Sequence, residues 1–183
     1  EQMNAQLESI IGQLKGEYNL AESKPGVRFF EGKDGFEEAI HDTLSAREEI
    51  LAVVNPSEIE NVVPEIEIEY VKERINQGVN KKILSTEPYS DIPNIEQYKK
   101  LTEVRLLPDK TNPFSASVQI YDNKVMYFTL TKESLISIII EHKDIYEINK
   151  AIFNLIWNKS KKSGFLEPSK DLQEKMKEEV DKN

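Results

Sequence analysis

Two glycines, Gly32 and Gly35, stand in the stretch KPGVRFFEGKDGFEEAI, where a short apolar run gives way to a helical pattern. A phosphate-binding loop needs backbone N–H groups that converge on the anion, and the nucleotide-binding motifs add a Lys-Ser/Thr pair or a third glycine. Here carboxylates crowd the loop instead: Glu31, Asp34, Glu37 and Glu38. Asp34 and Glu37 have the spacing of a capping box. Gly32 permits a sharp exit from a strand, and Gly35 falls at the first helical position. The loop is therefore predicted to turn the chain rather than to hold phosphate.

The two histidines, His41 and His142, are the candidates for nucleophilic or acid–base catalysis. Cleavage of a phosphodiester through a phosphohistidine needs a lysine two residues after the histidine, on the same face of a strand, with an aspartate four residues farther on. Lys143 directly follows His142 and would point to the other face, and Thr43 rather than lysine stands two residues after His41. His41 is instead predicted to lie at the edge of a helix. No catalytic residue is assigned.

The sequence lacks the residue patterns that are typical of metal sites and of several common enzyme active sites. The chain has no cysteine, which excludes thiolate ligands, and two histidines give little support for a transition-metal site. The acidic run EIEIE, residues 65–69, would place alternate glutamates on different sides of a helix. No G-x-S-x-G, H-E-x-x-H or Walker-type segment occurs. The sequence predicts no metal, no cofactor and no enzymatic activity.

Composition and charge narrow the class of protein. The 183 residues, of which 38% are hydrophobic, are enough for one core. The formal net charge of −9 repels a polyanion and argues against direct binding of DNA or RNA by this segment. The apolar runs are far shorter than the roughly 20 residues that cross a bilayer, and no signal peptide is recognisable. A cytoplasmic protein without membrane attachment is expected.

Strand and helix patterns alternate in the first half of the chain. Residues 27–30, 50–54 and 82–85 are predicted as buried strands, and helical spacing fills the gaps between them. Pro64 either kinks the second helix or marks its first turn, and Gly78 ends that helix. Such an alternation implies right-handed crossovers and a parallel sheet.

The second half of the chain is richer in strands. A short helix at 95–101 precedes four strands that are expected to be antiparallel neighbours, at 104–107, 117–121, 125–130 and 135–140. Asp122 and Asn123 suit the positive-φ positions of a tight hairpin turn. A long helix follows, and its apolar residues are predicted to be buried against the sheet: Ile145, Ile148, Ile152, Phe153, Leu155, Ile156 and Trp157.

A narrow apolar seam occupies the amino end of the chain. Its residues follow a 4-3-4 spacing on one stripe of a helix: Met3, Leu7, Ile10 and Leu14. Two heptads are marginal alone. The helix either docks on its own domain or forms the end of a longer coiled coil, and the second is favoured. A homodimer held by these four residues is therefore expected.

Three segments together resemble a known family. They are KPGVRFFEGKDGFEEAIHDTL from Lys24, PFSASVQIYDNKVMYF from Pro113 and AIFNLIWNKSKK from Ala151. In this order they resemble the C-terminal effector domain of TrmB-like prokaryotic transcriptional regulators, over about residues 24–162.

The resemblance implies an α/β fold of the phospholipase D type, a single domain with a mixed sheet flanked by helices, that has lost the catalytic His-Lys-Asp set. It also implies a DNA-binding winged helix outside this chain, joined through a coiled-coil helix. The implied organisation is a connector or coiled-coil helix at 1–22, the effector domain at 23–163 and a charged tail with a helical pattern at 164–183. In the family's archaeal members this domain resembles a sugar sensor, so the expected effector is a sugar or another small metabolite.

Ligands of parallel sheets bind beyond the carboxyl ends of the strands. Polar residues near the predicted strand ends are the candidate ligand-binding residues: Glu31, Asn55, Ser57, Ser85 and Thr86. The predicted function is non-catalytic effector sensing and dimerisation, coupled to the distant DNA-binding domain by population shift. Two alternatives stay open: a divergent phosphodiesterase of the same fold, which would need His142, and a standalone protein-interaction scaffold.

Overall fold

The computed structural model describes residues 26–88, 95–107, 116–131 and 134–162. The predicted connector at 1–22, with its seam residues, and the charged tail at 164–183 lie outside these ranges. The strands are β1 (Gly26–Glu31), β2 (Glu49–Val54), β3 (Asn80–Ser85), β4 (Thr102–Leu106), β5 (Ala116–Tyr121), β6 (Lys124–Thr131), β7 (Ser134–Glu141) and β8 (Lys161–Lys162). The helices are α2 (Gly32–Asp42), α3 (Pro56–Val62), α4 (Pro64–Gln77), α5 (Ile95–Leu101) and α6 (Lys143–Lys159), with a 3-10 turn η1 (Thr43–Ser45).

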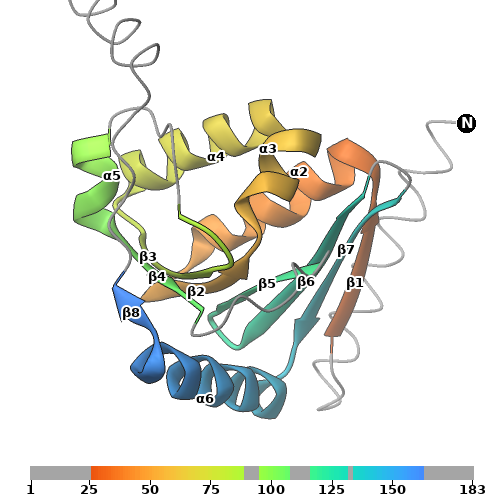
Figure 1. Cartoon of the computed structure of the whole chain (residues 1–183). Coiled ribbons are helices and arrows are strands. Elements are labelled where there is room, and N and C mark those ends of the chain that lie inside the picture. The colour runs from red at the N-terminus through yellow and green to blue at the C-terminus, as the bar shows by residue number, and fades with distance from the viewer. Residues whose placement is uncertain (1–25, 89–94, 108–115, 132–133, 163–183) are drawn as a thin grey trace, which may run out of the picture.

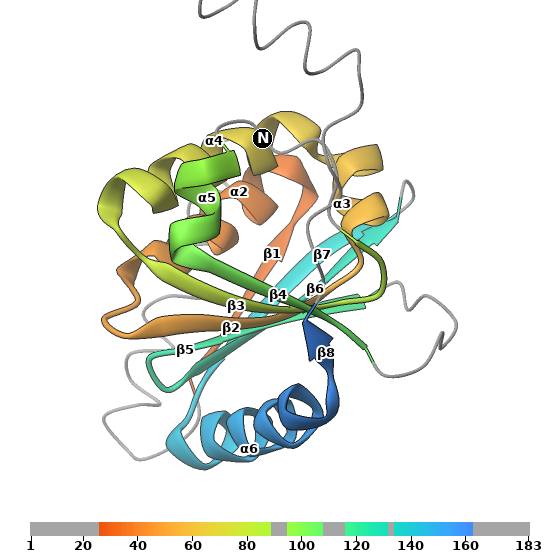
Figure 2. The ribbon, with the colours of Figure 1, turned by 60° about the vertical axis from the view of Figure 1, so that its left-hand side comes forward.

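The strands form one mixed sheet in the order β1-β7-β6-β5-β2-β3-β4-β8. β2, β3 and β4 are parallel neighbours, and all other pairs are antiparallel. Helices α2 to α5 cover one face of the sheet and α6 lies on the other face (Figure 1, Figure 2). The predicted α/β fold with a mixed sheet between helices is confirmed.

Two strand pairings differ from the sequence-based expectation. β1 does not join the parallel set, because the β5–β6–β7 strands lie between it and β2, and β1 pairs antiparallel with β7 at the edge. The strand predicted at 104–107 pairs parallel with β3 rather than antiparallel with its successors. Hydrophobic periodicity identifies strands but carries no information on which strands pair, so both errors have the same origin.

The glycine-rich loop begins α2. Gly32 is the first helical residue and has a φ of +73°, a left-handed conformation that suits glycine. At Gly35, in the first turn, a Cβ atom would lie 3.2 Å from the Cβ of Phe30, so this glycine lets the helix approach the end of β1. The expected capping box is wrong, because Glu31 is the N-cap residue and makes no side-chain capping bond, while Asp34 lies inside the helix.

The second helical segment is divided at Pro64. Val63 leaves the helical region with φ −138° and ψ 47°, so α3 ends there and α4 begins with Pro64 at its first position. Proline is favoured there because its missing N–H would be unpaired in any case. Gly78 ends α4 in a left-handed conformation, with φ +74°, as the sequence predicts.

Two cores lie on the two faces of the sheet. The larger fills the space under α2 to α5, and the smaller lies under α6 around Leu51, Ile120, Phe153 and Trp157. Phe153 and Trp157 are buried, as predicted, and their stacked rings have centroids 5.4 Å apart. The prediction that the whole apolar set of α6 is buried is wrong for three of its members, which are 57%, 49% and 66% exposed: Ile148, Ile152 and Leu155.

Candidate functional site

Four of the five predicted ligand-binding residues come together at the carboxyl ends of β2 and β3. Asn55 directly follows β2 and is buried. Its side-chain oxygen, Oδ1, accepts hydrogen bonds from the Ser57 hydroxyl at 3.0 Å and from the Thr86 hydroxyl at 3.3 Å. The Thr86 N–H also donates to the carbonyl oxygen of Val54 at 3.3 Å. These bonds make one polar cluster from two parallel strand ends.

Glu87 completes the cluster, and the sequence-based prediction missed it. Its carboxylate oxygen Oε1 accepts a 3.0 Å hydrogen bond from the backbone N–H of Ser57, in the first turn of α3. The Ser85 hydroxyl donates to the main-chain carbonyl oxygen of Glu87. Because a carboxylate already occupies the amino end of α3, the cluster repels an anionic ligand and favours a neutral or hydroxyl-rich one. A glutamate two residues beyond a strand end was the available sequence signal.

Glu31, the fifth predicted residue, is not part of this cluster. It ends β1 and pairs with Ile136 in the strand register, at the same end of the sheet as Asn55. β7, β6 and β5 lie between β1 and β2. At about 4.8 Å per strand, Glu31 stands roughly 19 Å from the end of β2.

Three buried, uncharged polar side chains lie on β5 and β7, on the face of the sheet that α2 to α5 cover. Ser117 on β5 and Ser137 on β7 are both cross-strand neighbours of Phe128, and Gln119 is a neighbour of Ala52. All three polar side chains are less than 9% exposed. Gln119 Oε1 and Ser137 Oγ have no hydrogen-bond partner within the described ranges. Buried polar atoms are normally paired, so these two groups can bond a water molecule or a small polar ligand.

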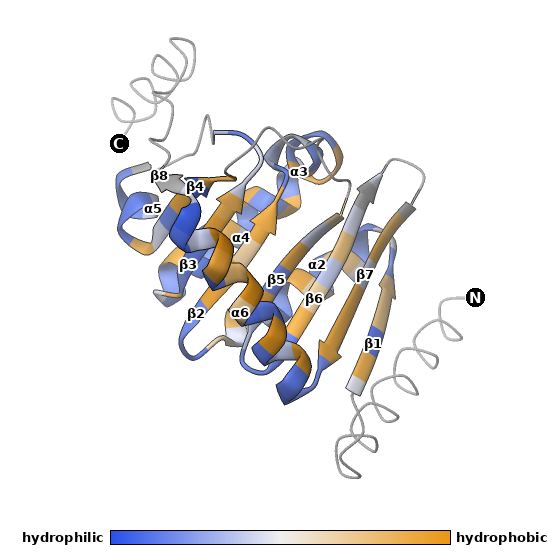
Figure 3. Cartoon of the chain, turned by 60° about the horizontal axis from the view of Figure 1, so that its bottom comes forward, coloured by the Kyte–Doolittle hydropathy of each residue, from blue (hydrophilic) through white to orange (hydrophobic). Residues whose placement is uncertain are grey.

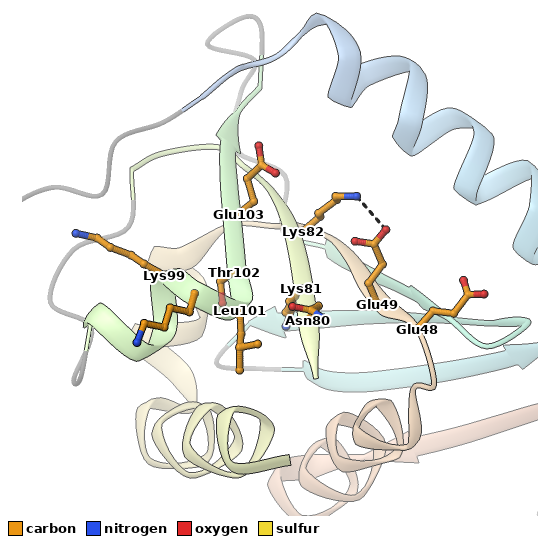
Figure 4. Close-up of a pocket in the computed structure, with 10 residues that line it drawn as sticks. Glu48, Glu49, Asn80, Lys81, Lys82, Lys99, Leu101, Thr102 and Glu103 are labelled. Atoms are coloured by element: carbon orange, nitrogen blue, oxygen red, sulfur yellow. Dashed lines mark hydrogen bonds and ion pairs between the residues drawn. The ribbon is translucent and has the colours of Figure 1, made fainter. Parts of the chain in front are cut away.

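The opposite edge of the sheet carries a hollow of about 650 Å³ that the sequence did not predict. It lies at the amino ends of the parallel strands β2, β3 and β4 and beside the end of α5 (Figure 4). Lys82 and Glu49 form a 2.9 Å ion pair on one side of it, and Lys99 points away from that pair (Figure 4). Its other lining residues are Glu48, Asn80, Lys81, Lys100, Leu101, Thr102 and Glu103. The mixture of lysines and glutamates gives this hollow no dominant sign of charge.

Two buried basic side chains, Arg74 and Lys81, lie at this end of the sheet, and Lys81 is one of the residues that line the hollow. The guanidinium of Arg74 donates to the carbonyl oxygen of Val79 and to the hydroxyl of Thr102, both at 2.7 Å. The Lys81 amine lies 4.8 Å from the centre of the Tyr70 ring and 3.3 Å from its hydroxyl. Burial lowers the pKa of Lys81 to about 7. Lys81 and Lys82 are adjacent in the predicted strand, so they must point to opposite faces, but the sequence does not show that the face of Lys81 would be buried.

The two histidines lie in separate layers. His41 is in the last turn of α2, where its Nε2 is 3.0 Å from a carboxylate oxygen of Glu73 on α4. His142 precedes α6 on the other side of the sheet, and its Nδ1 is buried without a hydrogen-bond partner in the described parts of the chain. The structure therefore does not bring the two imidazoles together.

Carboxylate and imidazole side chains are dispersed over the described part of the chain. It contains no group of three or more His, Asp or Glu side chains arranged to hold a metal ion. None of the described helices is long and apolar enough to span a membrane.

Comparisons with known proteins bear on the fold. No protein-family model matches the chain, and no curated protein matches it by sequence. Among solved structures, TrmBL2, an archaeal chromatin protein whose structure shows a mode of DNA binding, is similar with a TM-score of 0.53 and 19% identity. That match covers 89% of this chain and 64% of TrmBL2, so the chain spans less than two thirds of that protein.

Two other similar structures are enzyme-related. Nuc from Salmonella typhimurium, a phospholipase D family member, has a TM-score of 0.53 and 19% identity, covering 76% of this chain and 99% of Nuc. Phosphatidylserine synthase from Haemophilus influenzae has a TM-score of 0.51 and 11% identity, covering 86% of this chain and 46% of the synthase. The prediction that the chain is not an enzyme is contradicted by these neighbours, because proteins with this fold include enzymes. The chain has the fold that phospholipase D family members and TrmBL2 share.

Proposed function

We propose that this chain is the effector-sensing and dimerisation domain of a TrmB-like transcriptional regulator. The observation that carries the proposal is the likeness to TrmBL2, which extends over 89% of this chain. In this proposal residues 1–22 connect to a DNA-binding winged helix outside the chain, residues 23–163 form the effector domain, and residues 164–183 form a tail. DNA is contacted through the winged helix, because the net charge of −9 disfavours contact by this domain.

The proposed effector site is the polar cluster of Asn55, Ser57, Ser85, Thr86 and Glu87. It lies at the carboxyl ends of β2 and β3, and β2 has a parallel neighbour, β3, on one side and an antiparallel neighbour, β5, on the other. The carboxyl ends of parallel strands are the usual place for ligands in such sheets. Its hydroxyl and amide groups suit a sugar or another neutral, hydroxyl-rich metabolite. A ligand that prefers one arrangement of the dimer would shift its population and so change the spacing of the DNA-binding domains.

A melting-temperature screen of residues 1–183 against sugars and other metabolites tests this site. At a ligand concentration of one hundred times Kd, we expect stabilisation of about 2.7 kcal/mol, a rise in Tm of roughly 5–10 °C. The variant Thr86→Val should reduce the shift, because it removes a hydroxyl of the cluster. The matched control Lys82→Gln, at the opposite edge of the sheet, should keep it. A shift that depends on Lys82 and not on Thr86 places the ligand in the hollow instead, and no shift with any compound contradicts effector sensing.

The likeness to a phospholipase D family member favours a second candidate function, hydrolysis of a phosphodiester. His142 is the side chain on which this alternative depends. Incubation with bis(p-nitrophenyl) phosphate should release nitrophenol, and His142→Ala should abolish the release if the alternative holds. Release that His142→Ala leaves unchanged, or no release, argues against it.

A further inference from the structure

The face of the sheet that carries α6 is covered only in part. α6 starts at the end of β7 and packs mainly on β6 and β5, and to a lesser extent on β2 and β7. Figure 3 shows that, among the described elements, no helix lies over β1 and most of β7, and that both strands consist mainly of hydrophobic residues. A sheet normally buries such a face, because each exposed apolar group is unfavourable in water.

The uncovered strands present large apolar side chains. In the strand register Phe29 pairs with Ile138 and Val27 pairs with Ile140, and all four point to the α6 side. Tyr127 on β6 is the next neighbour of Ile138. Val27, Phe29 and Tyr127 are 49%, 55% and 38% exposed.

The outer side of α6 continues this surface. Ile148, Ile152 and Leu155 follow an i, i+4, i+7 spacing, which places them on one stripe of the helix. The hydroxyl of Tyr127 donates a 2.8 Å hydrogen bond to Oδ1 of Asn149, which lies beside that stripe. The strands and the helix therefore form one surface, which we call the apolar face: Val27, Phe29, Tyr127, Ile148, Ile152 and Leu155.

The size of the apolar face suits a protein interface. Six half-exposed large side chains present about 100 Å² each, or roughly 600 Å² of apolar surface, by scaling from the area that such side chains bury. That is as large as the largest apolar patch of a typical monomer, and it approaches the roughly 800 Å² that each partner buries in a standard complex. A surface of this size and chemistry is expected to be covered.

We infer that the apolar face is covered by the same face of a second copy of this chain, so that α6 and β1 form a two-fold dimer interface. The inference rests on the proposed function, which includes dimerisation. It adds a second contact surface to the seam that is predicted at the amino end of the chain. The seam that is predicted to pair two chains ends at Leu14, and 11 residues join it to Gly26, the first residue of β1. A seam dimer therefore holds the two copies of β1 within a limited distance of each other, because 11 residues span at most about 40 Å.

The net charge of the protein also favours contact between two copies through the apolar face. Two chains of net charge −9 repel each other, so they associate best through a surface that carries no charge. The six side chains of the apolar face are uncharged, and a two-fold interface needs only one self-complementary patch.

Substitutions that place a carboxylate on the apolar face test the inference in the full chain of residues 1–183. Sedimentation equilibrium should show a dimer for the unaltered chain and at least a tenfold higher dissociation constant for Phe29→Asp and for Ile152→Asp. The matched control is Ile68→Asp on α4, because Ile68 is 45% exposed on the opposite layer and its substitution should leave the constant unchanged. Melting curves check that the variants are folded.

A disulfide experiment gives a second readout that does not require weakening the dimer. The chain has no cysteine, so Leu155→Cys introduces a single thiol, and mild oxidation should link two chains faster than it links the Ile68→Cys control.

A dimer that persists in both aspartate variants but is lost in Ile10→Asp overturns the interface and leaves the seam dimer intact. A rapid intrachain disulfide in a Leu7→Cys, Phe29→Cys double variant shows that the chain's own amino end covers the face, which also overturns the inference. An unaltered chain that is monomeric contradicts both the interface and the proposed dimerisation, whereas the effector site is tested separately by the melting screen.

Discussion

Asp42 binds side chains from three strands at the end of α2. Its carboxylate accepts hydrogen bonds from Arg28 at 2.6 Å, from Tyr121 at 2.8 Å and from Lys124 at 2.8 Å. Burial by itself would raise the pKa of this carboxyl, but the hydrogen bonds from Lys124, Arg28 and Tyr121 outweigh it and hold the pKa below the ordinary value of 3.8. The charged form is therefore favoured in the folded protein, and it ties α2 to β1, β5 and β6.

The substitution Asp42→Asn should lower the free energy of unfolding by about 2–3 kcal/mol at pH 7, because it leaves two cations without their partner. The contribution of Asp42 is present above its unfolded pKa and is lost as the pH falls through the lower folded pKa. Urea unfolding at pH 7 and near pH 3 should therefore show a difference between variant and unaltered chain that shrinks in acid. Glu69→Gln, an exposed carboxyl on α4, is the control, with an expected effect within about 0.5 kcal/mol. A difference that is equal at both pH values contradicts this account.

Lys81 presents the opposite case, a cation whose charged form is disfavoured by the fold. Burial is the largest cause of its low pKa, the charge of Arg74 lowers it further, and the carboxylate of Glu67 acts in the other direction. Burial also raises the pKa of Glu67. Between the folded pKa of about 7 and the unfolded value of 10.5, the unfolded chain binds more protons. The stability of the protein should therefore rise with pH across this window.

The variant Lys81→Met should remove that dependence, because methionine fills a similar volume without a titrating group. Urea unfolding at pH 7 and pH 9.5 should show the free energy of unfolding rising with pH in the unaltered chain by on the order of 2–3 kcal/mol more than in Lys81→Met. Lys82→Met, which alters the neighbouring and less buried lysine, should retain most of the rise. Equal pH slopes in Lys81→Met and the unaltered chain would show that Lys81 stays charged in the folded protein.

At the scale of elements, helix ends are fixed by local residues. Pro64 begins α4 and Gly78 ends it, with the Gly78 N–H donating to the carbonyl oxygen of Ile75 at 3.0 Å. Asp122 and Asn123 adopt positive φ values of 37° and 63° in the β5–β6 turn. Each of these positions requires a residue type that tolerates its backbone conformation, which is why such features can be recognised without a structure.

Gly78→Ala should lower the free energy of unfolding by about 1–2 kcal/mol, because alanine at a φ of +74° brings its Cβ too close to the backbone. No atom from elsewhere in the described structure lies within 4 Å of the position that a Cβ would take at Gly78, so the effect should come from the local backbone alone. The control is Asn76→Ala, an exposed position in the same turn, where alanine should be neutral or slightly stabilising. Urea denaturation midpoints measure both variants, and an equal effect at the two positions would contradict the argument.

At the scale of the molecule, the two faces of the sheet are unequally covered. Four helices and a large core cover one face, while α6 and a smaller core cover part of the other. The candidate effector cluster and the apolar face therefore lie in different places, the first at the strand ends beside α3 and the second on β1 and α6. A ligand bound at the effector cluster can therefore act on the apolar face only through the sheet. β2 connects the two regions, because Asn55 lies at its end and α6 packs on it.

Sequence alone determined the features that depend on neighbours along the chain. The seven strands β1 to β7, the end of α4 at Gly78, the hairpin at Asp122 and the burial of Phe153 and Trp157 were predicted correctly. The gathering of Asn55 and Thr86 was also predictable, because parallel strands in successive crossovers end at the same edge. Local conformation and hydrophobic periodicity act over a few residues, so they can be read from the order of the residues.

Tertiary structure decided the features that depend on which distant segments meet. It placed β1 at the edge beside β7 and thereby separated Glu31 from Asn55. It brought the carboxylate of Glu87 to α3, turned Lys81 into the core and left Ile152 exposed. Strand order and burial result from the packing of the whole chain. A hydrophobic pattern indicates that a side chain prefers to be buried, but it does not indicate which part of the chain will cover that side chain.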